Sequence, residues 1–284
     1  MLQAIANGLM LGGLYACIAV GFSLVWGVLN VINMLHGSLI IFAGYLTYFA
    51  WANAKIHPLL ALLGVTGLMF IFGYALQYLL INRVVKRPVL TTLTLTFGLD
   101  MMLYNFMNVY FEATPRRITL NWGSVSLGDI VLPLDRLVAM ALAFTLTGLL
   151  YAVMRASKAG RAIVAVRMDR DAAALMGIRI PQIYAMTFGI GAGMAGACGV
   201  LFAVAFPVTT NVSGLLLGKA FVVCVIGGLG SVPGALLGGL ALGLIESFGG
   251  HWFGPQNAIT IGFVLMLVLL MVRPTGLLGI KGYE

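Results

Sequence analysis

Long apolar runs without charged residues alternate with short polar stretches along the chain. From Met1 to Asn53 the sequence contains no Asp, Glu, Lys or Arg, and this length holds two membrane crossings at about 20 residues each. Such runs predict eight or nine membrane-spanning helices. They cover residues 4–29, 36–54, 59–82, 91–111, 137–154, 183–206, 214–230, 235–249 and 258–272. We therefore expect an all-α, polytopic helix bundle that forms one transmembrane domain over residues 1–284.

Two regions interrupt this pattern inside the expected membrane zone. Residues 30–38 and 207–234 contain polar and turn-forming residues. Irregular backbone is tolerated at membrane depth only where it packs against protein or lines a wet cavity. Some spans are therefore expected to be discontinuous.

The composition supports the membrane assignment, since 61% of the residues are hydrophobic and 8% are charged, against about 25% charged in a soluble domain. The first apolar segment lacks the basic start of a secretory signal peptide, so we expect it to be retained. The cysteines lie far apart in apolar runs and are expected to be small buried hydrophobes. Glycine pairs at GxxxG spacing favour internal helix packing over a dimer motif. These pairs are Gly8/Gly12, Gly189/Gly193, Gly234/Gly238 and Gly239/Gly243.

The net charge of +8 is explained by topology, which makes nucleic-acid binding a poor explanation for it. Three basic clusters are expected on the cytoplasmic side, and the charge-balanced stretch from residue 112 to residue 136 outside. Five crossings before residue 155 then place the amino terminus outside, and four after residue 181 return the carboxyl terminus to the cytoplasm. The clusters are Arg83, Lys86 and Arg87; the cations of residues 155–181; and Arg273 with Lys281.

Residues 155–181 hold six basic and two acidic residues, a third of the charges in the chain. Within this cytoplasmic loop, Asp169 or Asp171 can cap a short helix that ends at Gly177. Three apolar side chains would then be exposed unless a partner covers them. They are Leu175, Met176 and Ile178. Such a knob suits docking into a groove of a cytoplasmic partner, and a basic loop held by anionic membrane lipid is the alternative.

Several motifs carry a resemblance to known proteins. The segment 161–187, with its DAAALMGI sequence, resembles the coupling loop of ABC importer permeases. Four more motifs resemble the permeases of branched-chain amino acid ABC transporters, and the resemblance extends from about Leu9 to Gly279. They are NMLHG at residues 33–37, GKAF at 218–221, GGLGSVPGA at 227–235 and RPTGLLG at 273–279.

This resemblance implies one half of a membrane pore in a bacterial inner membrane, paired with a second, homologous permease. Two cytoplasmic ATP-binding subunits would drive it, and a periplasmic substrate-binding protein would deliver branched-chain amino acids or related small amphiphiles for alternating access. The chain itself is expected to be non-catalytic, without cofactor or metal. The residues expected to couple to the ATPase subunits are Arg161, Asp169, Arg170, Asp171, Ala172, Ala173, Leu175, Met176, Gly177 and Ile178. Residues 214–220 are one residue too short for a nucleotide-binding P-loop, and Ala220 replaces its Ser or Thr.

Three ionisable residues fall within predicted spans, and we expect them to face the bundle interior. They are Asp100, Lys219 and Glu246. Lys219 with Glu246 is the preferred ion pair, either structural or lining the translocation path. Polar residues of the interrupted segment could also line that path, namely Asn33, His36, Gly37 and Ser38. The competing function is a self-contained secondary transporter or channel, driven by an ion gradient through the three charges.

Overall fold

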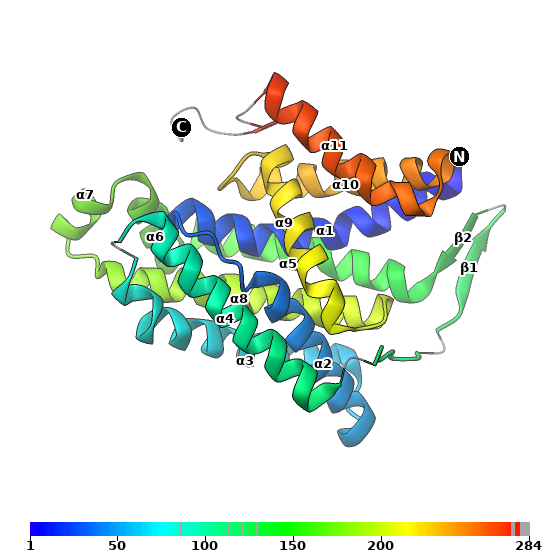
Figure 1. Ribbon diagram of the computed structural model, residues 1–284, viewed down its shortest axis with the longest axis horizontal. Coiled ribbons are helices and arrows are strands. Elements are labelled where there is room, and N and C mark those ends of the chain that lie inside the picture. Colours follow the sequence, from blue (N-terminus) through cyan, green and yellow to red (C-terminus); the bar gives the residue numbers. More distant parts are fainter. Residues whose placement is uncertain (86, 113, 121, 129, 274–275, 279–284) are drawn as a thin grey trace.

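A computed structural model describes residues 1–85, 87–112, 114–120, 122–128, 130–273 and 276–278. Five residues named above lie outside these ranges. They are Lys86, Lys281 and, from the last motif, Pro274, Thr275 and Gly279. The described chain is a bundle of helices with one small hairpin (Figure 1).

The long helices of the described chain fall on the predicted spans. They are α1 (Leu2–Leu29), α2 (His36–Ala54), α3 (Pro58–Leu79), α4 (Val89–Phe111), α5 (Leu134–Ala156), α8 (Ile180–Ala205), α9 (Ser213–Gly227), α10 (Val232–Phe253) and α11 (Pro255–Val272). Six described stretches are long and apolar enough to cross a membrane, those at α1, α3, α5, α8, α9 and α10. The all-helical, polytopic fold is therefore confirmed.

The shorter elements connect these helices. They are η1 (Ile81–Arg83), α6 (Lys158–Met168), α7 (Arg170–Leu175), η2 (Thr210–Val212) and the strands β1 (Ser124–Leu127) and β2 (Ile130–Pro133). The strands pair antiparallel, with Ser124 opposite Pro133 and Leu127 opposite Ile130. The Gln3 side chain holds the hairpin to α1, because it exchanges two hydrogen bonds with the Val131 backbone, at 2.9 and 2.8 Å.

The two ends of the bundle differ in charge. Figure 1 shows α6 and α7 at one end and the amino terminus with the hairpin at the other. Arg87 and Arg167 line a common cavity at the α7 end, whereas Arg116 pairs with Glu112 at the hairpin end. This arrangement agrees with the topology expected from the charges, with the amino terminus opposite the basic loop.

Helices α1 and α8 form the centre of the bundle. In the most apolar 18-residue stretch of each helix, 89% of the residues are buried, against 22% in the corresponding stretches of α3 and α5. Close approach of α1 and α10 depends on glycine: a Cβ on Gly12 would lie 2.8 Å from Leu240 Cα, and one on Gly8 would lie 2.9 Å from Leu244 Cα. These glycines therefore serve internal packing, as predicted, and the three cysteines are buried and free.

Two helices begin inside the bundle. Residues 30–35 are not helical, and α2 starts at His36, whose Nε2 lies 2.9 Å from the carbonyl oxygen of Ile18 in the middle of α1. Helix α9 starts beside it, since a Cβ on Gly37 would collide with the Ser213 carbonyl oxygen. The predicted interruptions within residues 30–38 and 207–234 are confirmed, because residues 30–35, 206–209 and 228–231 are not helical.

Candidate functional site

Helix α7 is a short, capped helix at the basic end of the bundle. The Asp169 carboxylate accepts hydrogen bonds from the backbone N–H groups of Asp171 and Ala172, both at 2.9 Å. Gly177 follows with φ of 83°, and the Ile178 N–H donates to the Ala173 carbonyl at 3.1 Å. Of the two aspartates considered as the cap, Asp169 fills that position. Both ends of α7 are thus fixed by local hydrogen bonds.

The end of α7 presents two large apolar side chains to solvent. Leu175 is 90% exposed and Met176 is 84% exposed, and we call this pair the docking tip. Ile178 is half-buried against the core, so the expectation that it would be exposed is wrong, because the chain turns back toward α8 after Gly177. Exposed Met168 at the end of α6 was not anticipated, although it directly precedes the helix cap.

The other residues assigned to coupling lie around α7. Ala173 is buried beneath the helix, whereas Arg170, Asp171 and Ala172 are exposed. Arg161 lies apart from them in α6, where its Nη1 donates to the Ala156 carbonyl at 3.0 Å and so closes the end of α5. The contacts of Arg161 are thus those of a residue that anchors the loop to the bundle.

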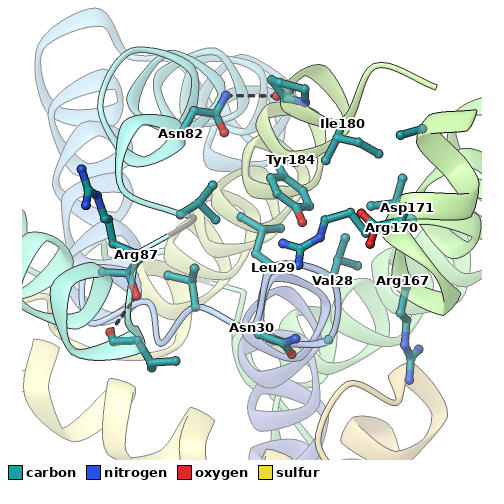
Figure 2. Close-up of a pocket in the computed structure, with 18 residues that line it drawn as sticks. Val28, Leu29, Asn30, Asn82, Arg87, Arg167, Arg170, Asp171, Ile180 and Tyr184 are labelled. Carbon is teal, nitrogen blue, oxygen red and sulfur yellow. Dashed lines mark hydrogen bonds between the residues drawn. The ribbon is translucent and has the colours of Figure 1, made fainter. Parts of the chain in front are cut away.

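A cavity of about 820 Å³ opens at the same end of the bundle. It lies between the end of α1, the connection from η1 to α4, helices α6 and α7, and the start of α8 (Figure 2). Figure 2 shows the Arg170 side chain directed toward Leu29, whereas Arg87 and Arg167 point away from the centre of the cavity. Thr92 of α4 also lines the wall.

The buried ion pair joins α9 and α10. Lys219 Nζ lies 2.8 Å from Glu246 Oε2, and both side chains are almost fully buried. The Tyr15 hydroxyl donates to the same Glu246 oxygen at 2.7 Å and accepts a short hydrogen bond from Lys219. Tyr15 was missed in the sequence because a single phenol in the apolar α1 gives no pattern. The three side chains therefore form a hydrogen-bonded cluster inside the bundle in which the charges of Lys219 and Glu246 cancel.

A second polar group surrounds the start of α2. Ser38 Oγ donates a hydrogen bond to Asp100 Oδ1 at 2.5 Å. Asn33 and His36, which precede Ser38 closely in the sequence, are both buried. The Asn33 side-chain oxygen and His36 Nδ1 have no hydrogen-bond partner within the described chain. The structure therefore joins Ser38 with Asp100 and places Lys219 with Glu246 in a separate site.

Asp100 belongs to a line of polar residues on α4 that the sequence analysis overlooked. Its members recur every fourth residue, so each lies beside the next one a turn away, and the line winds gradually around α4. They are Thr92, Thr96, Asp100, Tyr104 and Asn108, and we call them the α4 stripe. In the described chain, no group of three or more His, Cys, Asp or Glu residues could hold a metal ion.

The stripe contacts both irregular segments. Thr96 Oγ1 donates to the Ile32 carbonyl at 2.9 Å and accepts from the Met34 N–H at 3.4 Å. The Tyr104 hydroxyl donates to Asn211 Oδ1 at 3.2 Å. Thr96 and Tyr104 therefore hold α4 against the interrupted parts of the two broken spans.

Comparison with known proteins covers nearly the whole chain. Residues 4–272 match the family model described as branched-chain amino acid transport system / permease component. The chain is 32% identical to the high-affinity branched-chain amino acid transport system permease protein BraD of Pseudomonas aeruginosa, covering 98% of this chain and 95% of that protein. It is also 32% identical to LivH of Escherichia coli K12, with the same coverage. No solved structure matches the chain.

A more distant relative is the probable branched-chain amino acid transport permease protein LivH of Methanocaldococcus jannaschii, which is 22% identical over 96% of this chain and 91% of that protein. The match to the family model spans every long helix of the fold. The chain therefore belongs to the family of permease components of branched-chain amino acid ABC transport systems, as a multi-pass, non-catalytic subunit of the inner membrane.

Proposed function

We propose that this permease carries branched-chain amino acids across the inner membrane together with a second permease chain. Two cytoplasmic ATP-binding subunits supply the energy, and a periplasmic substrate-binding protein delivers the cargo. The cargo assignment rests on relatives that cover almost the full chain and whose names state branched-chain amino acid transport. Carriage of related small amphiphiles fits the same architecture.

The docking tip is the observation that carries the coupling assignment. Leu175 and Met176 are almost fully exposed on a helix whose two ends are fixed, at the end of the bundle that bears most of the basic charge. A rigid apolar projection suits insertion into a groove of an ATP-binding subunit. Closure of the two ATP-binding subunits would push on α7, and α5 and α8 would transmit this movement to the path for alternating access.

The second permease fits best against the face formed by α2, α4 and α9. This face carries polar groups, including Asp100 and Asn211, that are partly or fully exposed on the single chain. The exposed positions of α3 are instead apolar or glycine, apart from Tyr78 near its end. Because polar groups at membrane depth avoid lipid, the α3 face suits lipid and the α2–α4–α9 face suits protein or water.

Substitution of Met176 by aspartate tests the coupling assignment. A buried charge in a docking groove should cost about 2 kcal/mol or more, which corresponds to roughly 30-fold weaker binding. We expect Met176→Asp to lose the ATP-binding subunits on purification in mild detergent and to lose ATP-dependent leucine uptake. Met176→Leu, which stays apolar, is the matched control and should retain both. Normal uptake by Met176→Asp with the ATP-binding subunits still attached would refute the assignment.

A further inference from the structure

Asp100 is a carboxylate in the span expected at residues 91–111, without a positive partner in the described chain. It lies at the midpoint of α4, which spans Val89–Phe111. The Ser38 hydroxyl donates to its Oδ1 at 2.5 Å, while the described residues offer no ion pair to either oxygen. A charged group at this depth is expensive unless something pairs with it. The described residues thus leave Asp100 open to a cationic partner.

The surroundings of Asp100 leave room for such a partner. Asp100 is only partly buried. The carboxylate is therefore accessible from outside the chain, close to the start of α2, which carries Ser38.

The α4 stripe connects Asp100 to the cavity at the basic end. Thr96 lies one turn away and holds the irregular segment through Ile32 and Met34. Thr92, one turn further, lines the cavity, whose volume of about 820 Å³ lies within the range of small-molecule sites, about 300–1,000 Å³. Thr92 and Thr96 are themselves buried in this structure, so a solute would pass from Asp100 to the cavity when the irregular segment moves away from α4.

We propose that Asp100, positioned by Ser38, binds the α-ammonium group of an amino acid that moves along the α4 stripe into the cavity. An ammonium group is a threefold donor, and a carboxylate with a free oxygen accepts it in a charge-assisted hydrogen bond. The inference rests on the proposed function, since the cargo must be an amino acid. It assigns the binding residue to Asp100, the positioning residue to Ser38 and the exit to the cavity beside Thr92.

Uptake by the complete complex in liposomes, with ATP and saturating leucine-loaded binding protein, is the first test. Saturation removes differences in delivery, so the rate reports the permease. We expect Asp100→Asn to lower the initial rate about tenfold or more, because a charged hydrogen bond is replaced by a neutral one. Asn105→Ala is the matched control and should keep the rate, because Asn105 lies on α4 outside the stripe and bonds only to its own helix at Met101.

Direct binding to the purified complex without binding protein is the second test. Saturation-transfer NMR with L-leucine should give a signal that leucine amide, which keeps the ammonium group, displaces. The same concentration of 4-methylpentanoate, which lacks the ammonium group, should leave the signal unchanged. Asp100→Asn should abolish the leucine signal, Ser38→Ala should weaken it, and Asn105→Ala should retain it. A purely structural role for Asp100 would not produce this selectivity for the ammonium group.

The possible results separate the competing explanations. Normal uptake and leucine binding by Asp100→Asn would overturn the inference and leave the proposed function intact. Loss of the second permease from the Asp100→Asn complex, in proportion to lost uptake, would assign the carboxylate to the interface and also overturn it. Displacement of leucine by 4-methylpentanoate would do the same. Absence of leucine uptake by the unmodified complex would instead refute the proposed function.

Discussion

Two sites inside the bundle carry charge, and the chain satisfies them differently. Lys219 and Glu246 neutralise each other at 2.8 Å and share the Tyr15 hydroxyl. Within the described chain, Asp100 accepts one hydrogen bond, from Ser38, and it is only partly buried. The first site is complete within the chain and holds three helices together. The second has no cationic partner among the described residues, which is the property expected of a group that binds a transported ammonium group.

Breaking the ion pair should give the largest effect on stability. Lys219→Met or Glu246→Gln leaves an uncompensated buried charge or polar group, which costs about 3–5 kcal/mol. We expect either variant to reduce the yield of folded protein and the midpoint of thermal unfolding in detergent. The double variant Lys219→Met/Glu246→Gln should recover much of the loss. Additive effects of the two substitutions would show that the side chains do not act as a pair.

Removing the Tyr15 hydroxyl should have the next largest effect. Tyr15→Phe deletes one hydrogen bond to a carboxylate and one from an ammonium group, and bonds to charged groups contribute about 1.5–3 kcal/mol. The unfolding midpoint should fall by less than in the single ion-pair variants. The control is Tyr184→Phe, because Tyr184 is as buried as Tyr15 but lines the cavity instead of contacting Lys219 or Glu246. An equal decrease of the unfolding midpoint in the two variants would show that the Tyr15 hydroxyl does not stabilise the Lys219–Glu246 pair.

Gly37→Ala tests the contact between the starts of α2 and α9. Its Cβ would collide with the Ser213 carbonyl oxygen, and overpacking of this kind costs about 1–3 kcal/mol. We expect a lower unfolding midpoint together with slower leucine uptake, because α2 carries Ser38 away from Asp100. Gly214→Ala is the matched control, since its Cβ meets nothing within 4 Å. An unchanged unfolding midpoint and uptake rate in Gly37→Ala would show that the starts of α2 and α9 are not in close contact.

Asp100→Asn should have the smallest effect on stability. The substitution keeps the shape and the bond from Ser38, so the free energy of unfolding should change by about 0.5 kcal/mol or less. Its effect on leucine uptake should nevertheless be large. A loss of stability as large as that of Glu246→Gln would show that Asp100 is as important for the fold as the Lys219–Glu246 pair.

Much of the fold was predictable because apolar runs of membrane length directly specify helices. The discontinuous spans were predictable as well, since Asn33 and its polar neighbours interrupt one run. The β1–β2 hairpin was not, because its short strands depend on Gln3, more than 120 residues away, for two hydrogen bonds. Long-range contacts of this kind leave no local pattern.

The candidate sites were predicted unevenly. Asp169 and Gly177 have strong local preferences for helix ends, so the ends of α7 could be assigned in advance. Ile178 was misjudged because its packing depends on where α8 begins. The α4 stripe was readable as polar residues every fourth position, yet only Asp100 stood out by charge. Its role as a path depends on which segments lie against α4, and this requires the structure.

ATP-dependent uptake of leucine tests the central claim that the permease is driven through α7. The purified complex in liposomes, with ATP and leucine-loaded binding protein, should transport leucine. Met176→Asp should abolish this transport although the permease itself stays folded, and Met176→Leu should preserve it. Leucine uptake by the permease alone, without ATP and driven by an ion gradient, would contradict the account and identify a self-contained carrier.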